Sequence, residues 1–556
     1  MPNASGVLSA HDYLLTSVIG LPAVAALVVA VLPNRERLVR AVGAFTVVAT
    51  LALAVVIGIE FSSGFPGYQM VADYAWIPAF GISFHLGVDG ISLFLVLLTG
   101  ALFPLAMLGG PVKRNPKSYV AWMLVLEAAC MGSFLSLDLF LFFVFFELTL
   151  VPIYFVIAGW GFQRRGYAAV KFFLYTFLGS AFFFVGMLAV VFIHAAHSGH
   201  VSFNLLALES DPGVLGGAGT WLFLAFTAAF AVKAPVFPLH TWSPDAYAEA
   251  PTGGVIILAA VMAKLGTYGM IRFDFGLFPK ASVYFVPLML TLAVIGILYG
   301  AVVACRQPDL KRLVAYSSLS HMGFIVLGLF ALTAQSMTGG VIEMLNHGLY
   351  TGALFLLLAF IYKRWGTWQA NELRGAQRVA PVLAGAFTVA MMAAIGLPGL
   401  NGFVGEFLII IGTFVTHRWW AVVAASGAII ASIYMLWAFQ QAFHGKPRGV
   451  VAQPAGAAAG PGALRGMVGD LSTGERALII PLLVVVAFLG VYPAPVLNRI
   501  VPSVNALISH VEANSSYVQP AVARLGPAGV AHAVSYRSKG SGGSAGSSSS
   551  PTGAGR

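Results

Sequence analysis

Apolar stretches of about 20 residues recur along most of the chain, and this recurrence limits the fold more than any other feature. Of 556 residues, 59% are hydrophobic and only 9% are charged, whereas soluble proteins carry about 25% charged residues. The apolar stretches are continuous and not alternating, which is typical of membrane-spanning helices and excludes a membrane barrel. The sequence therefore predicts an all-α polytopic membrane protein.

We expect about fourteen transmembrane helices, two of them broken by Gly and Pro. The expected spans are residues 14–33, 40–60, 89–110, 118–136, 138–159, 168–194, 220–248 (broken), 252–271, 282–305, 309–332, 338–362, 380–416 (broken), 419–441 and 477–497. Residues 65–88 mix aromatic residues with Gly and Pro, which predicts an interfacial hairpin. Residues 501–556 are polar and end in a Gly/Ser-rich stretch, so we expect a flexible tail there.

Lys and Arg residues gather in every second loop. Nineteen of them occupy one set of loops: Arg35, Arg37, Arg40, Lys113, Arg114, Lys117, Arg164, Arg165, Arg306, Lys311, Arg312, Lys363, Arg364, Arg374, Arg378, Lys446, Arg448, Arg465 and Arg476. The opposite loops hold only Arg272, Lys280, Arg418 and Arg499. The positive-inside rule places the basic loops in the cytoplasm and both termini on the outer side of the cell's inner (plasma) membrane. The formal net charge of +10 thus reflects topology and indicates no nucleic-acid partner.

The chain has only two cysteines, Cys130 and Cys305, which are far apart in the sequence. The sequence contains no CxxC pair, no iron–sulfur spacing and no haem-attachment motif. We therefore expect no cofactor, metal or redox centre to be held by this chain.

Titratable residues lie inside six different apolar segments, where the topology rule does not explain them. They are Glu147, Lys233, Lys264, His321, His347 and Glu406, with His240 and Glu127 as possible accessory residues. A charge at the centre of a bilayer costs about 2.5–3.5 kcal/mol or more, so such residues persist where they are paired, hydrated or functional. Burial brings lysine and glutamate toward neutrality, and histidine already titrates there. This series predicts a route for protons.

Simpler structural roles remain open for each of these residues. The lysines and Glu147 could form structural ion pairs, and the histidines could be interhelical hydrogen-bonding residues. Glu406 could satisfy a frayed helix end, and His240 could only anchor the break in "FAVKAPVFPLHTW". Glu343 is also expected to be buried, with no obvious partner.

The two broken segments are related by a common spacing. Lys233 and Glu406 are 173 residues apart, and Glu147 and His321 are 174 apart. We interpret helices 4–8 and 9–13 as two five-helix repeats, each with one broken helix; the odd helix count inverts the second copy in the membrane. The expected domains are residues 1–110 (helices 1–3), 118–271 (first repeat), 282–441 (second repeat), 442–500 (cytoplasmic loop and last span) and 501–556 (tail).

Three motifs carry a resemblance to a known family. They are "FFVFFELTLVPIYF", "AVKAPVFPLHTWSPDAYAEAPTGGVIILAAVMAKLGTYGMIR" and "GLPGLNGFVGEF". Together they closely resemble the antiporter-like membrane subunits of respiratory complex I, over roughly residues 85–445. A glutamate at position 406 is typical of the subunit M branch, whereas subunits L and N and the sodium/proton antiporter chains typically have lysine there.

The resemblance implies a proton-translocating subunit of an NADH:quinone oxidoreductase. Glu147 and Lys233 would form a charge pair, Lys264 would be the central relay, His321 and His347 would link it onward, and Glu406 would be the terminal proton-loading site. The implied partners are the lipid bilayer and neighbouring antiporter-like subunits L and N. NADH, FMN, iron–sulfur clusters and quinone would belong to other subunits of the complex.

Three alternatives remain at this point. The same fold serves multi-subunit sodium/proton antiporters and membrane-bound hydrogenases, against which Glu406 argues. An independent solute transporter also has inverted repeats and broken helices, but would gather its polar residues in one pocket. A structural scaffold would leave the buried charges without a purpose.

Overall fold

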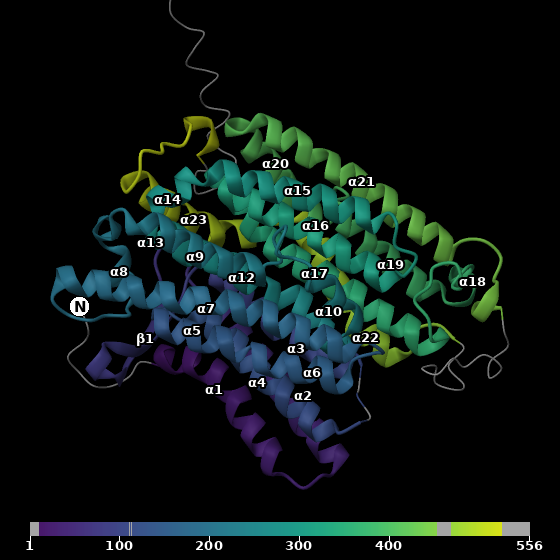
Figure 1. The fold of residues 1–556 in the computed structure, drawn as a ribbon. Coiled ribbons are helices and arrows are strands. Elements are labelled where there is room, and N and C mark those ends of the chain that lie inside the picture. The colour runs from purple at the N-terminus through teal and green to yellow at the C-terminus, as the bar shows by residue number, and fades with distance from the viewer. Residues whose placement is uncertain (1–9, 111, 113, 453–468, 525–556) are drawn as a thin grey trace, which may run out of the picture.

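The computed structural model describes residues 10–110, 112, 114–452 and 469–524, and the Gly/Ser-rich end of the expected tail lies outside them. Helices account for most of the described residues (Figure 1). Eleven helical segments of the described chain are long and apolar enough to cross a membrane. These are Tyr13–Val31, Glu36–Glu60, Pro116–Leu135, Leu139–Trp160, Arg165–Ser198, Thr252–Leu277, Val286–Ala304, Leu310–Phe330, Ala334–Trp365, Arg418–Phe443 and Thr473–Val491. The predicted polytopic helical membrane fold is confirmed.

Shorter apolar helices supply the rest of the bundle. Because these helices are shorter than the eleven segments above, the expected total of fourteen spans stays a prediction. They are α3 (Ser92–Leu108), α9 (Ala218–Lys233), α19 (Pro381–Ala394) and α20 (Asn401–Thr416). The remaining short helices are α8 (Leu205–Glu209), α10 (Ser243–Glu249), α14 (Pro279–Tyr284) and α18 (Ala376–Val379).

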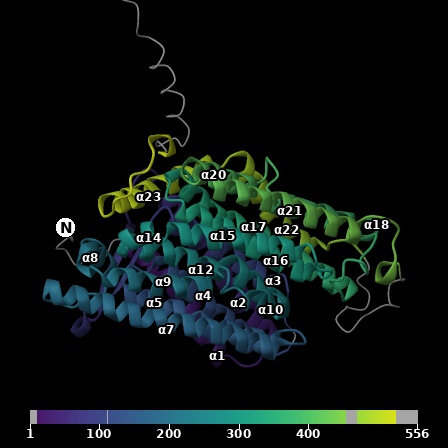
Figure 2. The same ribbon diagram turned by 45° about the horizontal axis from the view of Figure 1, so that its top comes forward.

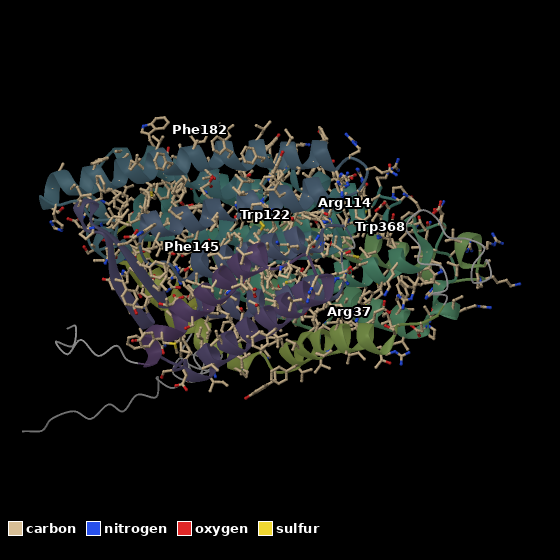
Figure 3. All side chains as sticks on the ribbon, turned by 90° about the horizontal axis from the view of Figure 1, so that it is seen from below. Arg37, Arg114, Trp122, Phe145, Phe182 and Trp368 are labelled. Carbon is tan, nitrogen blue, oxygen red and sulfur yellow. The ribbon has the colours of Figure 1, made fainter. Side chains whose placement is uncertain are left out.

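The centre of the bundle is formed by three long helical segments. They are α11–α13 (Thr252–Leu277), α16 (Leu310–Phe330) and α17 (Ala334–Trp365), and all three are buried along nearly their whole length. In contrast, α7 (Arg165–Ser198) runs along the lower edge of the bundle in Figure 2, and α21 (Arg418–Phe443) lies on the opposite side. Phe182 of α7 points away from the protein (Figure 3) and is exposed, as expected for a lipid- or subunit-facing side chain.

The other long helices complete the bundle around this centre. They are α1 (Ala10–Val31), α2 (Glu36–Glu60), α4 (Pro116–Leu135), α15 (Val286–Ala304) and α22 (Thr473–Val491). Helix α4 packs against α1, α2 and α3, while α15 packs against α16 and α21. The polar residues of the central helices are thereby kept away from the lipid-facing surface.

Both expected helix breaks are present. Helix α9 ends at Lys233, and the chain resumes as a helix only at Ser243, the start of α10. The second break lies between α19 and α20, where Gly396 and Gly399 have φ angles of +71° and +94°. Such left-handed backbone favours glycine because other residues clash there.

Two spans are less regular than expected. The span expected at 138–159 divides into α5 (Leu139–Leu148) and α6 (Leu150–Trp160) at Thr149, because Pro152 has no N–H to bond the Leu148 carbonyl. The span expected at 252–271 continues to Leu277 and contains two π-helical turns, Leu258–Met262 and Met270–Asp274. Turns of this kind frequently occur at functional sites.

The segment 65–88 forms a hairpin of two antiparallel strands, β1 (Gln69–Ile77) and β2 (Ile82–Val88). Asp138, the N-cap of α5, accepts hydrogen bonds from the backbone N–H groups of Phe140 and Leu141 (both 3.0 Å) and of Ser83 in β2 (3.2 Å). One carboxylate therefore caps a membrane helix and ties the hairpin to it.

The expectation of a flexible tail from residue 501 is wrong for its first part. Helix α23 extends over Ala494–Ala513 and packs against α17 and α13. Val496, Ile500, Val504, Ile508 and Val511 are buried, and their spacing of three or four residues gives the helix one apolar face. Polar residues on its other face made this segment resemble a tail.

Three basic residues that we had counted as loop charges are buried instead. Lys311 donates hydrogen bonds to the carbonyls of Ala248 and Ala250 (both 2.8 Å) at the end of α10. Arg364 pairs with Glu475 of α22 at 2.5 Å. Arg272, in the second π turn, forms an ion pair with Asp89. These cations fix helix ends in addition to any influence on topology.

Candidate functional site

The ammonium group of Lys233 lies at the end of α9 and is buried. Its Nζ donates hydrogen bonds to Thr149 Oγ1 (2.8 Å) and, more weakly, to the Phe146 carbonyl (3.5 Å). It also lies 4.5 Å from the centre of the Phe146 ring, in a cation–π contact. The interruption between α5 and α6 thus provides the polar partners of this lysine.

Glu147 does not form the expected direct pair with Lys233. The two charges interact electrostatically, but among the described residues no ion pair includes Glu147, and its Oε1 has no hydrogen-bond partner. Glu147 is only partly buried. The side chain that accepts a hydrogen bond from the lysine is that of Thr149, which was not among the predicted site residues.

Glu127 lies fully buried in α4, and neither of its carboxylate oxygens has a partner among the described residues. It is one helical turn from Cys130, which is also buried and interacts electrostatically with both Glu127 and Lys233. Glu127 therefore lies near the Lys233 group without a direct contact to it.

Lys264 lies in α12 (Ala263–Gly269), directly after the first π turn. Its Nζ donates to the Ala259 carbonyl at 2.9 Å, within that turn, and contacts Nδ1 of His347 on α17. Both side chains are fully buried. The other imidazole nitrogen of His347 has no hydrogen-bond partner among the described groups.

His321 of α16 continues the series from His347 toward Glu406. The centres of the two imidazole rings are 5.8 Å apart. His321 Nδ1 lies 3.1 Å from Glu406 Oε1, although the two groups are not aligned as a hydrogen bond. Lys264, His347, His321 and Glu406 thus form a series of neighbouring titratable groups on four different helices.

Two members of this group were not among the predicted proton-transfer residues: Glu343, which we expected only to be buried, and Tyr350. Tyr350 Oη donates to Glu343 Oε1 at 2.7 Å, and the Tyr350 ring lies 5.4 Å from His321 and 5.5 Å from His347 between ring centres. A signal for them was available, because Glu343, His347 and Tyr350 are spaced by four and three residues. This spacing places them on one face of a helix.

Two glycines, one in the second helix break and one in α20, leave room for the two carboxylates. A Cβ atom at Gly405 would lie 2.2 Å from Glu343 Oε2, and one at Gly396 would lie 2.7 Å from Glu406 Oε2. Any other residue at either position would displace a carboxylate. Gly396 in the break thus accommodates Glu406, and Gly405 within α20 accommodates Glu343.

His240 lies within the first break and is buried between aromatic rings. Its ring centre is 5.5 Å from that of Phe237 and 4.8 Å from that of Tyr299, and its carbonyl accepts a hydrogen bond from the Ser243 hydroxyl. Among the described contacts none joins His240 to Lys233. Its surroundings fit the anchoring role that remained open for it.

The predicted residues therefore fall into two groups. The first surrounds Lys233 and includes Glu147. Glu127 lies near this group without a direct contact to Lys233. The second runs from Lys264 to Glu406. Helices α9 and α12 join the groups by packing closely, since a Cβ at Gly266 would lie 2.4 Å from the Phe230 carbonyl oxygen. No direct contact between Lys233 and Lys264 is recorded within the described chain.

One cluster has side chains of the types that hold metal ions. His321, Glu343 and Glu406 each direct one ligand atom into a space in which these atoms lie within 4.8 Å of one another. The cluster coincides with the end of the Lys264–Glu406 series. It is the same place at which a proton could be held between carboxylates.

Another buried charged cluster lies beside the hairpin. Arg272 pairs with Asp89, and its guanidinium lies 5.3 Å from the centre of the Tyr68 ring and 5.0 Å from that of Tyr268. Burial raises the pKa of the nearby Glu209 carboxyl to about 8, although Arg272 acts in the opposite direction. The contacts of this charged cluster link the hairpin, α3 and the end of α12–α13. The cluster is separate from the Lys264–Glu406 series.

Comparison with known proteins places this arrangement in a family. The family described as NADH:quinone oxidoreductase/Mrp antiporter transmembrane proteins matches residues 136–431. The chain is 39% identical over 522 residues to NADH-quinone oxidoreductase subunit M of Mycobacterium tuberculosis, and the match covers 86% of this chain and 91% of that protein.

Solved structures agree with this relationship. A chain of respiratory complex I from Thermus thermophilus superimposes with a TM-score of 0.79 at 31% identity, covering 89% of this chain and 99% of that one. A chain of the Mrp complex from a Dietzia species has a TM-score of 0.74 at 23% identity over 90% of this chain and 99% of its own, and thus shares the fold. The chain belongs to the NADH-quinone oxidoreductase subunit M family.

Proposed function

We propose that this subunit translocates protons in the membrane arm of a proton-pumping NADH:quinone oxidoreductase. The observation that carries the proposal is the series Lys264, His347, His321 and Glu406, in which each group lies next to the following one inside buried membrane helices. Four titratable groups in apolar surroundings are costly to retain without a function.

The chemistry of these groups suits stepwise proton transfer. Lys264 contacts an imidazole nitrogen, so it can exchange a proton with His347 directly. The ring centres of His347 and His321 are 5.8 Å apart, and a proton would pass between the two imidazoles through a bridging water molecule. His321 then delivers the proton to Glu406, where the second helix break provides the terminal loading site.

Lys233 would control this route from the first break. In the described state its ammonium is held by Thr149, and Glu147 acts on it only at longer range. A movement at the break that brings Lys233 closer to Glu147 would stabilise the charged lysine and alter its effect on Lys264. Glu127 and His240 would be accessory groups, the former near Cys130 and the latter as an anchor of the break.

The redox chemistry would take place in other subunits. NADH, FMN, iron–sulfur clusters and quinone would be bound there, and the subunits beside this one would be the antiporter-like subunits L and N. The complex would lie in the cell's inner membrane with the basic loops in the cytoplasm and both termini outside. The two inverted repeats, each with its broken helix, would provide two related half-routes across the bilayer.

A sodium/proton antiporter subunit is the second candidate, because the Mrp chain shares the fold. Glu406 favours the NADH:quinone oxidoreductase, as does the higher identity to its chains. Purification of the intact assembly separates the two functions. Co-purification with an iron–sulfur NADH dehydrogenase arm supports the first function, and its absence from an intact assembly supports the antiporter.

The proposed route is tested by the variants Lys233→Ala and Glu406→Ala in the assembled complex. Both should sharply reduce proton pumping while the complex still assembles. Lys280→Ala and Glu60→Ala are matched controls, since both side chains are exposed and outside the route. Normal pumping in both route variants would rule out the proposal.

A further inference from the structure

Two carboxylates, Glu343 and Glu406, meet at the end of the proton route. Glu343 is 0% exposed and Glu406 is 6% exposed. Together with His321 they direct oxygen and nitrogen atoms into a space in which these atoms lie within 4.8 Å of one another. They come from two different helices, α17 and α20, and neither forms an ion pair with a described Lys or Arg.

The individual oxygen atoms have distinct surroundings. Glu343 Oε1 accepts the hydrogen bond from Tyr350, while Glu343 Oε2 has no partner and faces the space kept open by Gly405. Glu406 Oε1 faces His321, and Glu406 Oε2 lies beside Gly396. An unpaired, fully buried carboxylate oxygen close to a second carboxylate is unfavourable when both groups are ionised.

Several other titratable groups surround the pair, but no described Lys or Arg lies within ion-pair distance of either carboxylate. They are His321 of α16, His347 and Tyr350 of α17, Lys264 of α12 and Tyr434 of α21. Lys264 interacts electrostatically with Glu343, but its ammonium donates to the Ala259 carbonyl and contacts His347, and it forms no ion pair with either carboxylate. Tyr434 donates its hydroxyl hydrogen to Ser317 and not to a carboxylate. Two neighbouring carboxylates in such a site repel each other when both are ionised, which favours a state in which the pair holds one proton.

We propose that Glu343 and Glu406 form a carboxyl pair that retains one shared proton and is the loading site of the pump. The inference rests on the proposed proton-translocating function. A second proton passes from the His321 imidazolium to the pair, whose charge changes from −1 to 0, and its release restores the charge of −1. Tyr350 positions Glu343 and stabilises its ionised form through the hydrogen bond.

A metal ion is the competing occupant of the same space. His321, Glu343 and Glu406 offer suitable ligand types. A shared proton is favoured because Tyr350 already donates to one oxygen and because a metal would have to lose its hydration to reach a buried site. A site with a shared proton and a site with a metal ion should respond differently to removal of divalent cations.

The test compares the pH dependence of proton pumping in proteoliposomes for the complex with Glu343→Gln and with Tyr350→Phe. In Glu343→Gln, Glu406 loses the neighbouring negative charge that favours its protonated form, so the alkaline limb should move to lower pH by about one unit or more. In Tyr350→Phe, ionised Glu343 loses its donor, and the alkaline limb should move to higher pH. A purely structural role would lower pumping at every pH without moving the limb.

The outcomes separate this inference from the proposed function. If Glu406→Gln pumps normally, the proposed function itself fails. If Glu406→Gln is inactive while Glu343→Gln and Tyr350→Phe keep the wild-type pH profile in an assembled complex, only the carboxyl pair is overturned. If EDTA, by removing divalent cations, changes the pH profile of the wild-type complex, the site holds a metal ion and the shared-proton proposal is overturned. Opposite shifts of the two variants, unaffected by EDTA, support the pair.

Discussion

The Lys264 ammonium contacts the His347 imidazole across 83 positions of sequence, and both side chains are fully buried. The contact depends on the π turn at Leu258–Met262, whose Ala259 carbonyl accepts a second hydrogen bond from the lysine. The geometry joins a helix of the first expected repeat to a helix of the second. It makes His347 the first group that can receive a proton from Lys264.

Replacement of His347 should therefore interrupt the route. In His347→Ala the direct acceptor of Lys264 is lost, and removal of a proton-transferring group slows such a step by about 10²–10⁴-fold. Proton uptake by proteoliposomes, followed with a pH-sensitive dye, measures the effect. His197→Ala is the control because His197 is exposed on α7. Equal pumping by the two variants would contradict the assigned order of groups.

Thr149 should be required to hold Lys233 in the described state. Thr149→Val keeps the shape of the side chain but removes the acceptor of a 2.8 Å hydrogen bond from a buried ammonium, which costs about 1–3 kcal/mol. We expect Thr149→Val to reduce coupling between electron transfer and pumping, and Thr149→Ser to restore it. The ratio of protons moved to NADH oxidised measures this coupling. A valine variant with an unchanged ratio would show that Thr149 does not hold the lysine.

Glu475 has two basic partners whose contributions should differ strongly. Its carboxylate pairs with Arg364 at 2.5 Å and with Lys363 at 3.0 Å, and the side chains of Arg364 and Lys363 are 2% and 35% exposed. Loss of one partner of a buried pair costs about 3–5 kcal/mol, whereas an exposed pair contributes about 0–1 kcal/mol. Arg364→Met should therefore lower the temperature of thermal inactivation far more than Lys363→Met. Similar shifts in the two variants would mean that burial does not distinguish these pairs.

Glu209 should make the stability of the complex depend on pH. Its carboxyl has a pKa of about 8 in the folded chain, raised mainly by burial and opposed by Arg272, against about 4.3 in an unfolded chain. The unfolded state therefore releases this proton first, and stability falls as pH rises from about 4.3 to about 8. The stabilisation of Glu209→Gln over wild type should grow across this range and level off above it.

Thermal inactivation midpoints at several pH values test the Glu209 prediction. Glu60→Gln is the control, since Glu60 is exposed at the end of α2. A Glu209→Gln difference that stays constant with pH would contradict the assigned titration.

Much of this site was predictable because a charged residue is conspicuous within the apolar sequence of a membrane helix. Lys233 and Glu406 stand out as charges beside Gly and Pro in apolar runs, and both breaks formed as predicted. Glu343 was expected only to be buried and Tyr350 was not singled out, although both share a helix face with His347. Their place in the site depends on neighbouring residues of α16 and α20, and spacing along one helix does not reveal such neighbours.

Other features depended on tertiary structure. The π turns around Lys264 have no distinctive sequence, since the same residues fit a regular helix. Arg272 and Lys311 looked like loop charges because their partners, Asp89 and the end of α10, are distant in sequence. Helix α23 was mistaken for tail because its apolar face occupies only one side of the helix.

The most direct test of the proposed proton route is the number of protons translocated per NADH oxidised by the complex with Lys264→Met. This substitution keeps the length of the side chain but removes the ammonium group that contacts His347. The account predicts a clear fall in this ratio in a fully assembled complex. An unchanged ratio would show that protons do not pass through Lys264 and would contradict the proposed route.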